Sequence, residues 1–498
     1  METLDLLAQG FQVALTPTNL LFALVGVTVG TLVGVLPGLG PSGALAILLP
    51  TTYQASPVSS IIMLAGIYHG AMYGGSTTSV LVNIPGEASS VVTCLDGYQM
   101  ARRGRAGPAL GMAAFASFIA GTLSLVGLIL LAPPLAAFAL RFGPTEYFAL
   151  MVAGLVILSY MTHGSMVKGL MMAAAGLVLG TVGLDTITGR PRFTFGLTEL
   201  SDGIGFLPMA MGLFGIAEVL VGLEGGEKRD VYTGRLHGLL PTRRDWSESG
   251  LPIARGSVIG FLLGILPGGG AVLSSFVSYA VERRLARRPE EFGKGAIAGL
   301  AGPEAANNAG STGAFIPMLS LGIPSNSATA ILLGALLIYG VQPGPLLMRT
   351  HPDLFWGVVA SMYLGNLMLL MLNLPLIGLW VRLLRVPYDY LFPAILLFCL
   401  VGVYSVNNST TEVLLMVAFG LLGYLLRKAG FDPAPMVLAL ILGPMLELNF
   451  RQALILSQGD LTAFVRHPIA AVLLLVAAVL LVLPIVQDLS RKKGDRHA

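Results

Sequence analysis

Charged residues are scarce in this chain of 498 residues, since Asp, Glu, Lys and Arg together make up 11% of it. Soluble domains carry about 25% charged residues. Hydrophobic residues make up 55% of the chain, and the mean hydropathy is +0.80. These figures exclude a soluble enzyme, a disordered chain and a fibrous protein. The net charge of +3 is small and spread out, so we expect no nucleic-acid partner.

Cysteine is also nearly absent. Cys94 and Cys399 are too few for a disulfide framework and have no metal-ligand spacing. The sequence contains no HExxH, CxxC, Gly-x-Ser-x-Gly or Walker A motif, which argues against an enzyme and against an ATP-driven pump. We therefore expect no catalytic residue, no structural metal and no cofactor other than a coupling ion.

Long uncharged runs are what the sequence has in excess. Residues 6–86 contain no Asp, Glu, Lys or Arg, a stretch about four times the ~20 residues of one spanning helix. The chain is expected to be an all-α polytopic membrane protein with about ten to twelve transmembrane helices. Its 63 glycines and 30 prolines predict that some helices are broken or re-entrant. Spans are expected near residues 19–36, 57–73, 108–132, 145–161, 165–183, 204–222, 325–347, 354–381, 390–406, 410–426, 433–448 and 468–487.

One pattern occurs twice in the chain, 230 residues apart. Segments 30–40 and 260–270 both read Gly-x3-Gly-x-Leu-Pro-Gly-x-Gly. Gly75-Ser76-Thr77, followed by Ile-Pro, recurs as Gly310-Ser311-Thr312, again followed by Ile-Pro. We infer a fused duplication with an inverted second copy, the usual plan of secondary transporters. The predicted divisions are a first membrane repeat (1–224), a cytoplasmic connecting loop (225–251), a second membrane repeat (252–450) and an extra C-terminal transmembrane helix with a basic tail (451–498).

The distribution of basic residues predicts the orientation. The long polar stretch at 224–255 and the C-terminal tail are rich in Lys and Arg, whereas the first five residues carry two acids and no base. By the positive-inside rule, the central loop and the C-terminus lie in the cytoplasm and the N-terminus lies outside.

Prolines predict where the helices break. Pro37 and Pro267 occupy matching positions of the first motif, and Pro85 and Pro324 follow the second. A break in lipid must be buried in protein or must face water. A simple kink explains one isolated Pro-Gly, but matched breaks in both halves of a duplication indicate a transport site.

Hydroxyl and amide side chains gather around these breaks. Each alone is best explained as a helix-packing hydrogen bond, but a duplicated cluster beside a helix break favours a ligand site. Half-helix N-termini suit a carboxylate, and we assign substrate binding to Ser76, Thr77, Thr78, Asn83, Pro85, Gly86, Ser311, Thr312, Pro324, Ser325, Asn326 and Ser327. Open carbonyls and amide oxygens suit a small cation, and we assign cation binding to Gly38, Gly40, Gly268, Gly270, Asn307 and Asn308.

Neither polar cluster contains Arg or Lys. Bound cations, either sodium or protons, are therefore expected to supply the positive charge that an anionic substrate needs. Two other ionisable residues leave alternatives open. His69 is either functional, as buried ionisable groups in membranes usually are, or a neutral histidine satisfied by a neighbour. Glu304 is either a cation ligand or a helix cap.

Taken together, these motifs resemble the large membrane subunit of the tripartite tricarboxylate transporters. The resemblance rests on segments 34–41, 73–78, 83–86, 104–111, 303–309, 322–324 and 443–447, and it covers residues from about 20 to about 485. It implies cation-coupled uptake of tricarboxylates or other organic carboxylates across the bacterial inner membrane. It also implies a small four-helix membrane subunit and a periplasmic substrate-binding protein as partners, with the lipid bilayer around them.

Other functions are also compatible with the duplicated fold. The alternative is an ion channel or an exporter, and a third class is an intramembrane enzyme or a structural scaffold. The lack of paired catalytic residues near the breaks counts against the enzyme. A symporter accumulates its substrate against a gradient, whereas a channel does not.

Overall fold

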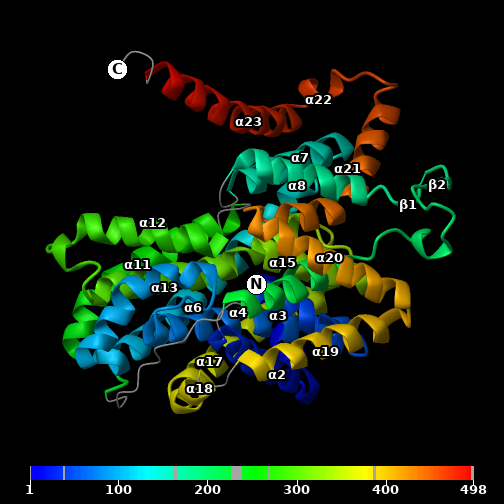
Figure 1. Ribbon diagram of the computed structural model, residues 1–498. Helices are drawn as coiled ribbons and strands as arrows, with labels where there is room; N and C mark the ends of the chain where they lie inside the picture. The colour runs from blue at the N-terminus through cyan, green and yellow to red at the C-terminus, as the bar shows by residue number, and fades with distance from the viewer. Residues whose placement is uncertain are drawn as a thin grey trace. The chain divides into compact units, whose positions relative to one another are not determined.

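The computed structural model describes residues 2–36, 40–161, 165–185, 187–225, 238–266, 270–384 and 388–494, except for the side chains of residues 2, 388–391 and 483–494. Helices make up most of this part of the chain (Figure 1). Two short strands, β1 (Gly183–Leu184) and β2 (Pro191–Arg192), pair antiparallel. The expected all-α fold class is confirmed.

The chain divides into two compact units. The first comprises Met1–Ala136 and Leu207–Tyr424, and the second comprises Ala137–Phe206 and Leu425–Ala498. The first unit contains α1 (Glu2–Ala14), α2 (Pro17–Val35), α3 (Gly40–Leu48), α4 (Pro57–Val82), α5 (Val91–Thr93), α9 (Phe206–Ala210), α10 (Ala217–Gly225), α11 (Arg243–Ile265), α12 (Gly270–Leu285), α13 (Ile297–Gly313), α14 (Phe315–Leu321), α15 (Ser327–Ile338), α16 (Leu347–Thr350), α17 (Pro352–Asn373), α18 (Ile377–Leu383), α19 (Tyr388–Asn407) and most of α6 (Ala106–Ala139) and α20 (Thr410–Lys428). The second contains α7 (Pro144–Met161), α8 (Met166–Leu179), α21 (Ala434–Leu456), α22 (Ala463–Arg466) and α23 (Pro468–Gly494).

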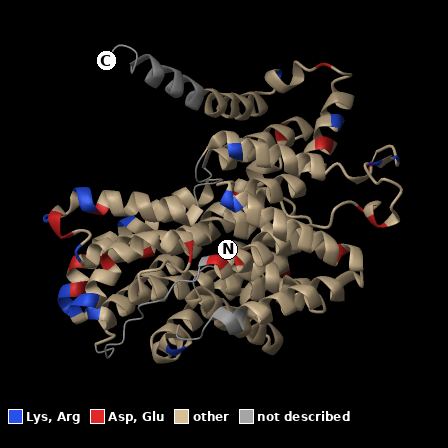
Figure 2. Cartoon of the chain, viewed as in Figure 1, with Lys and Arg blue, Asp and Glu red and all other residues tan. Residues whose placement is uncertain are grey.

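Six helices of the described chain are long and apolar enough to cross a membrane, judged by length and composition. Five further apolar helices are shorter, with 10–17 residues each. Figure 2 shows long stretches of helix without charge, and most charged residues lie near helix ends and connections. These features are those of a multi-pass membrane protein, while the number of spans and their orientation stay predictions.

Two expected boundaries differ from the helices observed. Helix α11 begins at Arg243, within the segment predicted to be a connecting loop. It begins there because the Thr242 side chain accepts a hydrogen bond from the Asp245 amide, and the Asp245 carboxylate accepts one from the Thr242 amide. The span expected at 354–381 is two helices, α17 and α18, which meet at residues 374–376.

Glycine stripes on α2 and α11 bring helix backbones into direct contact. A Cβ atom added at Gly26, Gly30 or Gly34 would lie 2.3–2.4 Å from the carbonyl oxygen of Met63, Ile67 or Ala71 on α4. The same holds for α11, where Gly256, Gly260 and Gly264 lie against the carbonyl groups of Gly302, Ala306 and Gly310 on α13. Such close approach is open only to glycine. The two helix pairs therefore use one packing arrangement.

This packing fixes the register between the two copies. The stripes of α2 and α11 are 230 residues apart, as the sequence motif predicts, but their partners on α4 and α13 are 239 residues apart. The expected match of Gly75-Ser76-Thr77 with Gly310-Ser311-Thr312, at an offset of 235, is therefore wrong by four residues. Four residues are about one helical turn, so both motifs occur on one helix face without being structural equivalents.

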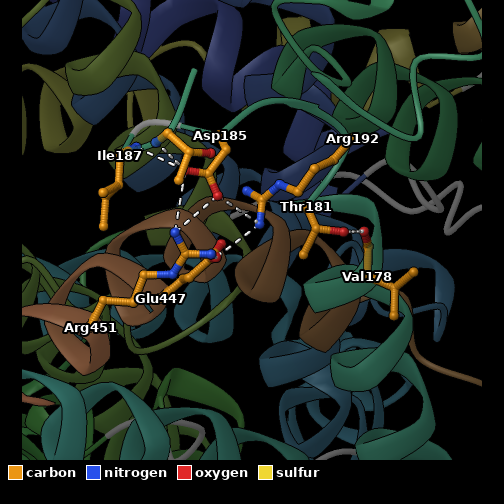
Figure 3. Close-up of polar contacts among 8 residues, drawn as sticks. Val178, Thr181, Asp185, Ile187, Arg192, Glu447 and Arg451 are labelled. Carbon is orange, nitrogen blue, oxygen red and sulfur yellow. Dashed lines mark hydrogen bonds and ion pairs between the residues drawn. The ribbon is translucent and has the colours of Figure 1, made fainter. Parts of the chain in front are cut away.

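An ion-pair cluster fixes the hairpin of the second unit to α21 (Figure 3). The Asp185 carboxylate accepts hydrogen bonds from the amides of Thr188 and Ile187, at 2.7 and 2.9 Å, and from Arg451 at 2.9 Å. Arg192 donates to Glu447 at 2.8 Å. The Thr188 amide, with the Ile187 amide and the Arg451 guanidinium, holds the pKa of Asp185 below its ordinary range.

The glycine stripe yields a test within one helix. Gly260→Ala should destabilise the protein by about 1–3 kcal/mol or more, because the added methyl meets a backbone carbonyl that cannot move aside. A Cβ at Gly250, also on α11, meets nothing within 4 Å. Gly250→Ala should thus be neutral or slightly stabilising. Thermal unfolding of the detergent-solubilised variants measures both, and equal melting temperatures would contradict the packing.

The Asp185 cluster yields a second test. Asp185→Asn should free the hairpin and speed tryptic cleavage after Arg192, with Arg451→Met adding little because it removes the same contact. Folding lowers the pKa of Asp185, so its stabilisation is present at neutral pH and is lost only as the pH falls through the lowered value. Protection should hold down to about pH 5. The control is Asp202→Asn at an exposed position of the same connection; if it is cleaved as fast, the cluster does not protect the hairpin.

Candidate functional site

Two helix breaks in the first unit have the same backbone geometry. Helix α4 ends at Asn83 in the left-handed conformation, with φ 59° and ψ 26°. Helix α14 ends at Gly322, 239 residues further along, with φ 72° and ψ 24°. An Ile-Pro pair follows in both places. The second pair of breaks that the prolines predict is therefore present in the structure, at the offset that the glycine packing sets.

Each break leads into a capped helical turn. The Glu87 side chain accepts a hydrogen bond from the Ser89 amide, and the Ser90 hydroxyl accepts one from the Glu87 amide. Asn326, at the matching position, accepts a hydrogen bond from the Thr329 amide at 2.9 Å, and the Thr329 hydroxyl accepts one from the Asn326 amide. Both are capping boxes. An acid therefore occupies the first N-cap and a neutral amide the second.

Reciprocal hydrogen bonds join the two copies at these caps. Asn307 on α13 donates to Glu87 at 3.2 Å, and Asn326 donates to the Tyr68 hydroxyl on α4 at 3.0 Å. Tyr68 and Asn307 are again 239 residues apart. Each cap is thus held by the long helix of the other copy.

A buried carboxyl group lies at the centre of a third set of contacts. Glu304, on α13, is 0% exposed. It accepts hydrogen bonds from the hydroxyls of Ser76 at 2.6 Å, Ser117 at 3.4 Å and Thr93. Asn308 donates to Ser117 at 2.7 Å. Among the described residues, no ion pair involves Glu304 or Glu87.

These contacts show that α4 and α13 run antiparallel. Ser76 lies against Glu304, and His69, two turns earlier on α4, lies 3.3 Å from Thr312, two turns later on α13. An inverted repeat requires such a relation between equivalent helices. Which end of each helix faces which side of a membrane stays a prediction.

The predicted substrate residues fall into three groups. Ser76 contacts Glu304, and Thr77 lines a cleft described below. Others hold the fold: Thr78 donates to the Val35 carbonyl of α2, and Ser311 and Thr312 donate to carbonyls of their own helix. A Cβ at Gly86 would lie 2.4 Å from Gly34 and Gly75, so this glycine is a packing residue.

The remaining substrate candidates lie at the two breaks. Ser325 is buried and the described residues offer its hydroxyl no partner, while Ser327 bonds Ser42 of α3 at 2.6 Å. Pro324 is buried, whereas Pro85 is half-buried and Asn83 is exposed. For these twelve residues substrate binding stays a prediction.

The predicted cation residues are partly placed. Gly38 and Gly268 lie outside the described residues. Gly40 and Gly270 begin α3 and α12 with φ of 59° and 44°. Asn307 contacts Glu87 and Ser89, and Asn308 contacts Ser117. Cation binding by this set stays a prediction too.

The structure bears on the alternatives stated for Glu304 and for His69. Glu304 is the eighth residue of α13, so the helix-cap alternative is wrong, and the cation-ligand alternative stays a prediction. His69 Nδ1 lies 2.9 Å from the Ala65 carbonyl and Nε2 lies 3.3 Å from Thr312. Both ring nitrogens of His69 therefore have hydrogen-bond partners, as the alternative of a neutral histidine satisfied by a neighbour requires.

Sequence reasoning gave too little weight to the residues around Glu304. Thr93, Ser117 and Tyr68 were not among the candidates. Thr93 and Ser117 belong to elements without a repeated motif, and Tyr68 lies two turns before the Gly-Ser-Thr motif of α4. A signal was present for the two acids: Glu87 ends the uncharged run 6–86, and Glu304 directly precedes another at 305–348. Acids so close to long apolar runs are the ones most often functional.

A small cleft lies beside these contacts. Its walls come from α4, α6 and the corner between α17 and α18. The lining residues are Tyr73, Ser76, Thr77, Leu110, Ala113, Ala114, Ser117, Asn373 and Ile377. Two hydroxyls that bond Glu304, those of Ser76 and Ser117, therefore also face the cleft.

Comparison with known proteins identifies relatives along the whole chain. Residues 20–438 match the family described as the tripartite tricarboxylate transporter TctA family. An Agrobacterium vitis protein, described as an uncharacterized 52.8 kDa protein in the TAR-I ttuC' 3' region, is 51% identical over 496 residues, which is 100% of this chain and 99% of the relative. A second A. vitis protein, from the TAR-II ttuC' 3' region, is 51% identical over 236 residues, which is 47% of this chain and 98% of the relative. No solved structure matches the chain.

The break at Asn83 yields a prediction about backbone conformation. Asn83→Gly should leave stability unchanged, because glycine adopts a positive φ freely. Asn83→Ala should cost about 1 kcal/mol, because alanine is strained there. Thermal unfolding distinguishes the two variants. A larger loss in the glycine variant would show that the amide side chain, and not the backbone, holds the break.

Proposed function

Because the chain belongs to the tripartite tricarboxylate transporter TctA family, we propose that it takes up tricarboxylates or other organic carboxylates by secondary active transport. It is a transporter-family protein with helices long enough for a multi-pass membrane protein. The proposal adds the substrate class, coupling to a sodium or proton gradient and residence in the bacterial inner membrane. It also adds the two partners, a small four-helix membrane subunit and a periplasmic binding protein.

The observation that carries the proposal is the chemical difference between two matched breaks. Glu87 and Asn326 occupy equivalent N-caps, but only Glu87 bears an acid. A carboxylate substrate is repelled by the first cap and is accepted by the second. A cation has the opposite preference. The two matched caps therefore differ in charge preference, as binding of an anion at only one of them requires.

The second break has further features that suit a carboxylate. Helix α15 begins there, and the partial positive charge of a helix N-terminus attracts anions. Ser325, directly before the cap, is 0% exposed and its hydroxyl has no partner among the described residues. A substrate oxygen would supply that partner. We assign substrate binding to Ser325, Asn326 and Ser327 first.

Replacing Asn326 by the acid of the other copy tests this assignment. Asn326→Asp keeps a good N-cap, so the protein should fold. It places a negative charge where the substrate carboxylate binds. The apparent affinity for substrate should weaken about ten- to hundredfold, equivalent to about 1.4–2.7 kcal/mol. Concentration-dependent uptake into proteoliposomes containing both membrane subunits, with the binding protein supplied, measures the change.

The control is Asn408→Asp, which adds the same charge at an exposed position of the first unit. This variant should transport normally. An unchanged affinity for substrate in Asn326→Asp would contradict substrate binding at the second break. Uptake that stops at equal concentrations on both sides would indicate a channel in place of a symporter.

A further inference from the structure

The cleft beside Glu304 contains oxygen atoms that lack partners. Thr77 and Asn373 both line it and are 3% and 5% exposed. Asn373 Oδ1 is buried with no hydrogen bond, while its amide nitrogen donates to the Leu369 carbonyl. The Thr77 hydroxyl lines the cleft, and no hydrogen bond joins it to the described residues. Asn308, in the same set of contacts, has a second unpartnered amide oxygen. Unsatisfied buried oxygens are rare and call for an occupant.

The nearby carboxyl group lacks a counter-charge. Glu304 accepts hydrogen bonds from Ser76, Thr93 and Ser117, whose hydroxyls act as donors to an acceptor-only carboxylate. A buried charge without an opposite charge is costly, and no Lys, Arg or His of the described chain forms an ion pair with Glu304. Ser76 and Ser117 also line the cleft, and the Ser117 oxygen, which accepts a hydrogen bond from Asn308, keeps one further lone pair.

We propose that this cleft binds one sodium ion, held by Thr77, Asn373, Ser76 and Ser117, with Glu304 as its counter-charge. The inference rests on the proposed function in one respect, since it names the coupling ion and its site. All ligands are oxygens, which hard cations prefer. The charge of one carboxylate matches a monovalent ion. The described residues contain no group of three or more His, Cys, Asp or Glu that would suit a transition metal.

A proton satisfies this site less completely. Protonation of Glu304 removes the buried charge, but it gives no partner to Thr77 or to Asn373. A metal ion in the cleft satisfies the carboxylate and the free oxygens together. The unpartnered oxygens therefore favour sodium over a proton.

The site also connects the ion to both copies of the fold. Ser76 belongs to α4, and Thr93 follows the first break. Glu304 belongs to α13, three residues before Asn307, which donates to Glu87 at that break. Filling the site draws these elements together, and its positive charge offsets the two acids that would otherwise repel a carboxylate.

Sodium binding can be measured without substrate or partners. The purified full-length protein in nanodiscs is melted at increasing NaCl, with choline chloride keeping ionic strength constant. A ligand of the folded state stabilises it in proportion to the logarithm of one plus the ratio of ligand concentration to dissociation constant, so the rise in melting temperature with sodium yields that constant. Wild-type protein should be stabilised by sodium beyond choline, and Glu304→Gln should lose this response.

A matched pair of variants separates ligation from folding. Thr77→Val removes one free hydroxyl from the cleft and should raise the half-saturating sodium concentration about tenfold, equivalent to about 1.4 kcal/mol. Thr31→Val makes the same change at a buried residue whose hydroxyl bonds its own helix at Val27. It should respond to sodium as wild type does. Should Glu304→Gln fail to fold, this pair still decides the matter.

The outcomes separate the ion site from the transport proposal. Equal sodium responses in Thr77→Val and Thr31→Val would overturn the site, as would wild-type protein that answers to pH and not to sodium. Failure of carboxylate uptake, with the sodium response intact, would overturn the proposed function and leave the sodium site standing. If wild-type protein shows no sodium response but takes up carboxylate, the sodium site is overturned, and the proposed transport stands with another coupling ion.

Discussion

Direct contact between helix backbones is the constraint on which the site depends. The stripes Gly26–Gly30–Gly34 and Gly256–Gly260–Gly264 let α2 lie on α4 and α11 on α13 with no side chain between them. This packing sets the rotation and the height of each long helix, and so determines which residues of α4 and α13 face one another. Ser76 meets Glu304, and Tyr68 and Asn307 reach the caps of the opposite copy, only at that register.

The sequence predicts the class of fold and the existence of the duplication, because both depend on local patterns. Uncharged runs indicate membrane helices. The same four-residue glycine spacing occurs on α2 and on α11, because both helices pack directly against a neighbouring backbone. The Ile-Pro breaks are recognisable because proline acts on its own backbone. The predicted match of the two Gly-Ser-Thr segments is wrong by one helical turn. Residues four positions apart lie on the same face of a helix, so periodicity alone cannot detect such a shift.

The Glu304 contacts could not be predicted in the same way. Ser76, Thr93 and Ser117 come from three elements and meet a residue about 190–230 positions later. No spacing rule relates them, because tertiary packing alone brings them together. The sequence does give one signal. Glu304 lies at the edge of a long apolar run, where a buried charge is energetically costly, so its presence indicates neighbouring groups that offset this cost.

The difference between Glu87 and Asn326 has a consequence for how such a protein arises. A homodimer built from one half-length chain would carry the same residue at both caps, so its two sites could not differ in charge preference. Fusion into a single polypeptide removes that obligation, and each half is then free to mutate alone. In this chain the two caps have used that freedom, since one bears a carboxyl group and the other an amide.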